Sequence, residues 1–161
     1  MEVKDLHQYR KDVEEVFKFF SEPDTIQAKY EGIGARNIKI LECSESGGSY
    51  LVKIEREVPS DVPGILQKFL GAWNKVVQTE QWQLQEDGIR TCDLKVDIVG
   101  VPVNVSGAMT LRPEGEGCVN DVRLTVSCSI PLVGKKLAEF VAGDTKKSMD
   151  AEHAYIAGHA A

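Results

Sequence analysis

The sequence predicts an α+β fold in which a curved antiparallel sheet of about seven strands wraps around one long C-terminal helix. Apolar and polar residues alternate through most of residues 35–130, as in strands with one buried face. One long helical pattern, residues 133–157, closes the chain. A sheet with one apolar face must cover that face, and this helix is the only element long enough to do so. Because a wide sheet twists and curls, we expect a cavity between the sheet and the helix.

The first 30 or so residues predict a strand followed by two short helices. Residues 3–9 have the pattern of a short strand. Apolar residues recur at helical spacing in residues 13–20, and Asp12 is a typical N-cap for that helix. A second short helix is predicted at residues 25–30 and ends before Gly32, a residue common just after helices.

Six more strands are predicted before the final helix. Asp87 and Gly88 form a typical hairpin turn between two of them. Pro131 ends the last strand, because proline lacks the N–H group that pairs with a neighbouring strand. Gly134 then lets the chain turn closely into the final helix. The six strands span residues 35–43, 49–58, 74–85, 88–100, 101–113 and 118–130.

Composition limits the class of protein. The 161 residues are most simply one domain, residues 1–161, and the formal net charge is −6. A protein that binds nucleic acids normally presents a basic surface, so the negative net charge disfavours nucleic-acid binding. The N-terminal stretch MEVKDLHQYRKD lacks the apolar centre of a signal peptide, and no apolar run approaches the roughly 20 residues of a membrane helix. We therefore expect a cytoplasmic protein without an integral membrane segment.

No sequence motif points to a metal ion, a cofactor or a catalytic residue. The four cysteines have no C-x-x-C spacing, and no histidine lies at zinc-finger spacing from them. The chain has no phosphate-binding loop, no dinucleotide fingerprint and no nucleophile elbow. The thiols are therefore expected to be buried or idle.

Two stretches resemble one known superfamily. DVEEVFKFFSEPDTI, residues 12–26, is similar to the start of the first helices in the START and birch-pollen-allergen-like (SRPBCC) superfamily. IPLVGKKLAEFV, residues 130–141, resembles the strand-to-helix junction in a bacterial branch of that superfamily, a domain of unknown function. Lys135 stands where that branch often has Gly, and Glu139 is displaced by one position. The resemblance implies a helix-grip fold with a ligand pocket between sheet and helix, and it names no ligand.

Residues 62–73 combine apolar side chains with glycines. Val62, Ile65, Leu66, Phe69, Leu70 and Trp73 lie at helical spacing. This spacing predicts an amphipathic helix of about two turns. The helix would either plug one end of the core or form a lid over a pocket, with Gly64 and Gly71 permitting hinge motion. The resemblance favours the lid, because related proteins place an access loop near this position.

Polar residues interrupt the apolar faces of two predicted strands. Arg56 shares a face with Ile54, and Gln78 and Glu80 share one with Trp82. Charges on a dry face pair with each other, hydrate or bind something. Antiparallel pairing of the two strands would bring Arg56 within reach of Gln78 or Glu80. An Arg56–Glu80 pair would be structural, whereas free polar groups would anchor a ligand headgroup or carbonyl.

The sequence thus favours binding of a small hydrophobic or amphipathic ligand, such as a lipid, a quinone or a polyketide-like compound. A second possibility is a cyclase or hydrolase that uses Glu80 or Arg56 in the same cavity. A third is an interaction module with a filled core and no ligand. No oligomeric state is predicted. The predicted ligand-binding residues are Arg56, Phe69, Trp73, Gln78, Glu80, Trp82, Val96, Leu137, Phe140, Val141, Asp144 and Met149.

Overall fold

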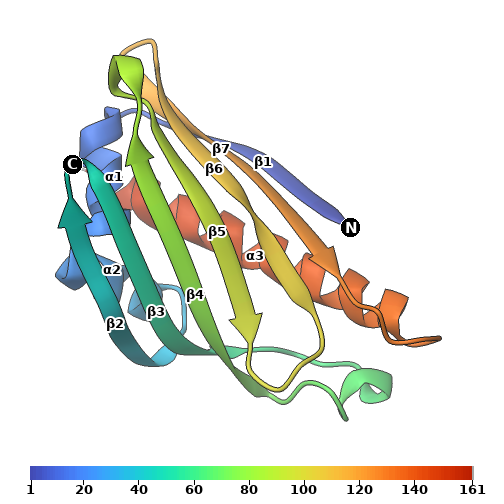
Figure 1. Cartoon of the computed structure of the whole chain (residues 1–161). Helices are drawn as coiled ribbons and strands as arrows, with labels where there is room; N and C mark the ends of the chain where they lie inside the picture. Colours follow the sequence, from blue (N-terminus) through green and yellow to red (C-terminus); the bar gives the residue numbers. More distant parts are fainter. Residues whose placement is uncertain (161) are drawn as a thin grey trace.

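The computed structural model describes residues 1–160, which form one curved antiparallel sheet with three α-helices on its concave side (Figure 1). The sheet has seven strands in the order β1-β7-β6-β5-β4-β3-β2. This arrangement confirms the predicted helix-grip fold and the predicted order of elements. The strands are β1 (Glu2–Tyr9), β2 (Arg36–Ser46), β3 (Ser49–Pro59), β4 (Trp73–Leu84), β5 (Arg90–Ile98), β6 (Asn104–Glu114) and β7 (Gly117–Ser127), and the helices are α1 (Val13–Ser21), α2 (Pro23–Gly32) and α3 (Gly134–His159).

The two short helices begin at residues suited to helix starts. Asp12 caps α1 as predicted, because its Oδ1 accepts a hydrogen bond from the Glu15 backbone N–H at 2.9 Å. Helix α2 begins at Pro23, two residues before the predicted start, since proline fits the first turn of a helix. A side chain at Gly32 would collide with the Tyr155 ring, so this glycine lets α2 approach α3 closely.

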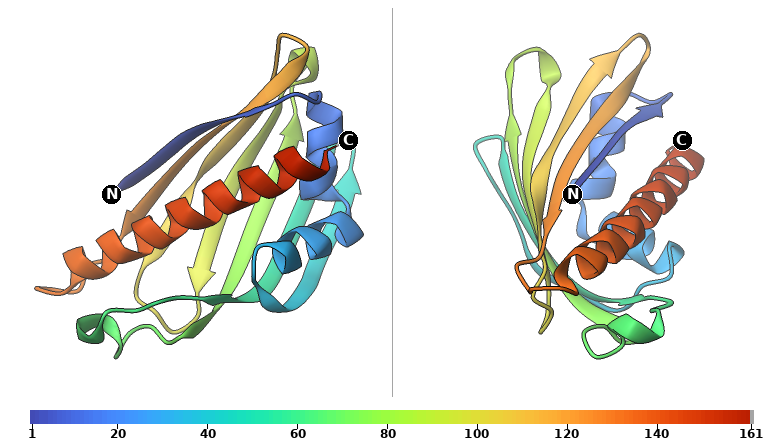
Figure 2. Two further views of the ribbon diagram at one scale, coloured as in Figure 1. Left: turned by 180° about the vertical axis from the view of Figure 1, so that it is seen from behind. Right: turned by 90° about the vertical axis from the view of Figure 1, so that its right-hand side faces the viewer.

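Helix α3 crosses the concave face of the sheet diagonally (Figure 2). It lies closest to β1, β7 and α2, while the middle strands face it from farther away. Inward residues of β5 and β7 such as Leu94, Ile98, Leu124 and Val126 are buried, as their alternation predicts. Among residues 1–160, no helix has both the length and the apolar character that crossing a membrane requires.

The prediction of an amphipathic helix at residues 62–73 is wrong. Only Gly64–Leu66 forms a single 3-10 turn, residues 67–72 are turn and loop, and Trp73 already belongs to β4. The Asn74 amide holds Gly71 in a local loop through two hydrogen bonds. Leu66 and Leu70 are buried, whereas Ile65 remains 59% exposed, so four-residue spacing here marks two anchors of a loop rather than a helix face.

The junction between β7 and α3 is a tight turn. Strand β7 ends at Ser127, three residues before the predicted end, and the Gly134 backbone N–H donates to the Ile130 carbonyl at 3.1 Å. A Cβ atom at position 134 would lie 3.3 Å from the Cys128 carbonyl oxygen, a tight contact that glycine avoids. Leu132 at the tip is fully exposed with a φ of 68°.

The predicted turn at Asp87 and Gly88 is part of a longer loop. Both residues have a positive φ, of 59° and 72°, as a primed hairpin turn requires. The flanking strands nevertheless separate at Leu84 and Arg90, and Glu86–Gly88 forms a short 3-10 turn between them.

Candidate functional site

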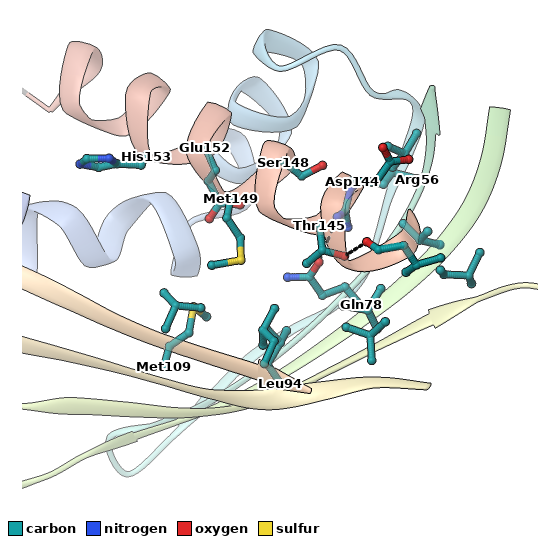
Figure 3. Close-up of a pocket in the computed structure, with 18 of the residues that line it drawn as sticks. Arg56, Gln78, Leu94, Met109, Asp144, Thr145, Ser148, Met149, Glu152 and His153 are labelled. Carbon is teal, nitrogen blue, oxygen red and sulfur yellow. Dashed lines mark hydrogen bonds between the residues drawn. The ribbon is translucent and has the colours of Figure 1, made fainter. Parts of the chain in front are cut away.

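A cavity of about 140 Å³ lies between the concave face of the sheet and α3. It is partly open to solvent. Figure 3 shows the labelled side chains of α3 above Gln78, Leu94 and Met109, which project from the sheet. The strand side is mainly apolar because inward positions of neighbouring strands carry Val, Leu and Ile. The helix side adds Val141, Asp144, Thr145, Ser148, Met149, Glu152 and His153.

A second cavity of about 230 Å³ lies against α2, β3 and α3. Tyr30 lines it from α2, and Lys147 and Ala151 line it from α3. It has four lining residues in common with the first cavity, so the two spaces meet between β3 and α3. The shared residues are Arg56, Val58, Ser148 and Glu152.

A row of polar side chains runs along the inward faces of β3 and β4. Arg56 Nη2 donates to Gln78 Oε1 at 3.0 Å, and Gln78 Nε2 donates to Glu80 Oε2 at 2.6 Å. Trp82 Nε1 donates to Glu80 Oε1 at 2.9 Å. Of the two partners that strand pairing allows for Arg56, the structure therefore has Gln78 and not Glu80. Arg56 lies opposite Val76 in the strand register, so Gln78 is its diagonal neighbour and Glu80 is beyond it.

Burial determines the protonation of Glu80. Its side chain is almost fully buried, and this burial raises the pKa of Glu80 because the carboxylate loses its water, although Lys29 opposes the change. Both carboxylate oxygens already accept hydrogen bonds from protein groups. Glu80 is thus a structural support for Gln78 and Trp82, behind the cavity wall.

Lys29 is a buried cation that no sequence pattern singled out. Its Nζ lies 3.3 Å from Glu152 Oε1 and above the rings of Phe20 and Tyr30, at 4.3 and 4.7 Å from their centroids. Burial alone would lower the pKa of Lys29, but the carboxylates of Glu152 and Glu80 and the Tyr30 hydroxyl outweigh it, and the pKa is raised. Lys29 therefore stays charged and links α2 to α3.

A charged cluster joins β1 to α3 beside His7, which lines the first cavity. His7 Nε2 lies 3.1 Å from Asp5 Oδ2, and the His7 ring stacks on His153 at 4.5 Å. Asp5, His7 and Asp150 have the donor atoms of a metal site, but Lys146 Nζ lies 2.6 Å from the carboxylates of both Asp5 and Asp150. The Lys146 ammonium thus bridges the two carboxylates and occupies the position that a cation would take.

The same cluster has shifted protonation equilibria. The hydrogen bond from Lys146 holds the pKa of Asp5 well below its usual range. Burial lowers the pKa of His7, and the nearby ring of His153 adds to this effect. His7 is therefore neutral near pH 7 and packs as an uncharged ring.

The structure brings six of the twelve predicted ligand-binding residues to the first cavity: Arg56, Gln78, Val96, Val141, Asp144 and Met149. The other six lie elsewhere. Trp82 is fully buried against Phe17 and Phe20, and Glu80 lies beside it. Trp73 stacks on the Arg36 guanidinium at 3.8 Å, Leu137 is buried in the core, and Phe69 and Phe140 pack against the core from its edge.

Several lining residues were missed by the sequence analysis. His7, Tyr9 and Asn120 line the cavity from β1 and β7. The alternation of β1 places His7 and Tyr9 on one face, and that pattern was available in the sequence. Their proximity to α3 depends on the path of the helix, which the pattern of a single element does not specify.

The model of the family described as "Protein of unknown function (DUF2505)" matches residues 6–158. No curated protein matches the chain by sequence. The chain is similar in structure to human StAR-related lipid transfer protein 5, with a TM-score of 0.61 and 14% identity over 98% of this chain and 74% of that one.

Two further solved structures have the same fold. Ara h 8.0201 has a TM-score of 0.63 and 14% identity, with 99% of each chain covered. A fragment of the STAR-related lipid transfer protein from Xanthomonas axonopodis has a TM-score of 0.59 and 15% identity, with 96% of this chain and 85% of that one covered. At these identities the likeness shows the fold alone. It confirms the resemblance to the START and birch-pollen-allergen-like superfamily.

Proposed function

The chain belongs to the DUF2505 family of proteins of unknown function, and from its helix-grip fold and its cavity we propose that it binds a small hydrophobic or amphipathic ligand between the sheet and α3. The observation that carries this proposal is a cavity whose surface is mainly apolar, with polar groups that converge on it from the sheet and from α3. Such sites bury most of a small ligand and fix its orientation with those polar groups. The names of the StAR-related lipid transfer proteins with this fold support the same class of ligand.

The volume of the first cavity limits the ligand. An apolar cavity of about 150 Å³ holds a benzene molecule, and this one measures about 140 Å³. We therefore propose that this cavity holds one short chain or one ring, such as the chain of a single-chain lipid, a quinone head or one ring of a polyketide-like compound. Met109 and Met149 line the space, and their flexible side chains let it adapt to different shapes.

We propose binding rather than catalysis for this cavity. A hydrolase or cyclase needs a general base within reach of the substrate. Glu80, the candidate base, does not line the cavity, and both of its oxygens are occupied by Gln78 and Trp82. Residues 1–161 would act as one ligand-binding domain.

The proposal is tested by native mass spectrometry of the purified protein after incubation with a lipid extract, followed by release and identification of the bound compound. Val96→Phe places a ring in the cavity and should reduce uptake by at least about tenfold, because the ligand loses its space. Val77→Phe is the matched control, since Val77 lies on the other face of the neighbouring strand.

The outcomes are distinct. Uptake by the wild type and by Val77→Phe, with loss in Val96→Phe, supports binding in this cavity. A wild-type protein that takes up no compound from the extract contradicts the proposal. Equal uptake by all three proteins places the ligand outside this cavity and contradicts it as well.

A further inference from the structure

Arg56 is a cation without a counter-ion at the point where the two cavities meet. One side of its guanidinium is occupied, because Nη2 donates to Gln78 and the group lies 4.2 Å above the Tyr30 ring. The other nitrogen, Nη1, is shielded from solvent and has no hydrogen-bond partner. A shielded charged nitrogen that makes no hydrogen bond is unfavourable, and structures rarely leave one without a reason.

Every nearby carboxylate already has a different partner. Glu80 accepts from Gln78 and Trp82, and Glu152 pairs with Lys29. Asp144 Oδ2 accepts a hydrogen bond from the Ser60 hydroxyl at 2.6 Å. Across residues 1–160, no carboxylate oxygen lies within ion-pair distance of Arg56, although twelve such contacts occur elsewhere.

A second unpaired donor lies next to Arg56. The Tyr30 hydroxyl is buried without a partner, and Tyr30 and Arg56 both line the second cavity. Burial raises the pKa of Tyr30 to about 12, so the hydroxyl keeps its proton at neutral pH and is able to donate it in a hydrogen bond. Asp144 and Glu152 on α3 repel an anion from the helix side. The strand side at Arg56 is therefore the favoured position for negative charge.

We infer that Arg56 binds the single carboxylate or phosphate group of an amphipathic ligand, whose apolar body occupies the first cavity. This inference rests on the proposed ligand-binding function and narrows the ligand to an amphipathic anion. Arg56 Nη1 would donate to one anion oxygen, and the Tyr30 hydroxyl, on the second-cavity side, is available for another. A planar guanidinium suits carboxylate and phosphate oxygens particularly well.

Isothermal titration calorimetry with three probes of equal chain length tests the inference: octanoate, octyl phosphate and 1-octanol. Wild-type protein should bind at least one of the two anions at least about tenfold more tightly than octanol, as expected for one added charge-assisted hydrogen bond. Arg56→Met should remove that preference, and it should still bind octanol. Octanol binding by the variant also shows that it retains a folded cavity.

The matched control is Arg36→Met, because Arg36 lies on the adjacent strand β2, pairs with Glu57 and lines neither cavity. It should keep the wild-type preference. Arg56→Lys should keep part of it, since lysine retains the charge without the planar pair of donors. The tighter of the two anions identifies the headgroup as a carboxylate or a phosphate.

Two results overturn the inference: equal binding of octanol and both anions by the wild type, or a preference that persists in Arg56→Met. In both cases octanol binding leaves the proposed ligand-binding function standing. Inorganic phosphate that binds as tightly as octyl phosphate would also overturn it, because the apolar body would then contribute nothing. A wild type that binds none of the chain-bearing probes contradicts the inference and the proposed function together.

Discussion

Lys29 and Glu152 show how two side chains depend on each other across α2 and α3. Lys29 has only 1% of its side chain exposed, whereas Glu152 retains 22%. Loss of Glu152 therefore lowers the free energy of unfolding more than loss of Lys29 does, because it leaves the fully buried ammonium without its anion. The pair determines how α2 and the end of α3 are held together beside both cavities.

Glu152→Gln should lower the free energy of unfolding by about 2–3 kcal/mol, because the buried Lys29 loses its counter-ion. The double variant Lys29→Met with Glu152→Gln should be more stable than Glu152→Gln alone, since the unpaired buried ammonium of Lys29 is gone. Urea unfolding followed by circular dichroism measures both. A double variant that is less stable than the single one would contradict this account of the pair.

His7 predicts a specific dependence of stability on pH. Burial lowers its pKa below the ordinary value of 6.5, so the unfolded chain binds the proton more readily than the native protein. Stability should therefore fall as the pH drops below about 6.5 and stop falling below the native pKa of His7. The charged and titratable groups that face it are Asp5 on β1 and Lys146, Asp150, Glu152 and His153 on α3.

The pH dependence of stability that comes from His7 occurs in a different pH range from the one that comes from Asp5. Asp5 has a lowered pKa, so its contribution to stability is lost only as the pH falls below about 4. His7→Gln should flatten the urea-unfolding profile between pH 7 and pH 5 and leave the loss below pH 4 in place. His159→Gln, at an exposed position near the end of α3, is the control and should leave the profile unchanged. A His7→Gln profile as steep as that of the wild type would refute the assignment.

At the scale of elements, a single hydrogen bond ties the loop after β3 to the middle of α3. The Ser60 hydroxyl donates to Asp144 Oδ2 at 2.6 Å, and both residues line the first cavity. This loop also carries Leu66 and Leu70 into the core. It is therefore anchored at Ser60 and again from Leu66 onward, while Ile65, which lies between these two anchors, stays exposed.

Ser60→Ala should accelerate both association and release of a cavity ligand by about fivefold, the factor that corresponds to one ordinary hydrogen bond. The affinity should change little, because the bond restrains opening in the free and the bound protein alike. Stopped-flow mixing with octanoate measures both rates. Ser46→Ala, at an exposed position on β2, is the control. A large loss of affinity at unchanged rates would show that Ser60 contacts the ligand instead.

The predictability of each element follows from how local its signal is. The alternation of β5 and β7 and the Asp12 cap depend on neighbouring residues, and these predictions are confirmed. Residues 62–73 were misassigned because two loop anchors four residues apart imitate a helix face. The sequence pattern allows either Gln78 or Glu80 as the partner of Arg56. It cannot choose between them, because strand register depends on long-range pairing that the local pattern of a strand does not contain.

At the scale of the whole molecule, the cavity follows from one-sided coverage of a curved sheet. Helix α3 approaches β1, β7 and α2, and the middle strands carry the apolar wall opposite it. A bound molecule would add contacts to both sides at once. Ligand binding should therefore stabilise the entire fold and not only the residues of the site.

A ligand at a concentration of about 100 times its Kd should raise the Tm by about 5–10 °C, from about 2.7 kcal/mol of added stability in a domain of this size. Differential scanning calorimetry with octanoate checks this value. Val96→Phe should show no such increase, because its ring fills the cavity, and Val77→Phe should behave as the wild type does. An equal increase in Val96→Phe would place the binding elsewhere.

Because α3 approaches the sheet mainly along β1 and β7, the inclination of one rigid element sets the width of the first cavity along its length. Bulkier or smaller residues at the contacts of α3 with β1 would tilt the helix and change the size of molecule admitted, without altering a lining side chain. Under the proposed function, such changes would give members of the family a route to new ligand sizes that leaves Arg56 and its neighbours intact.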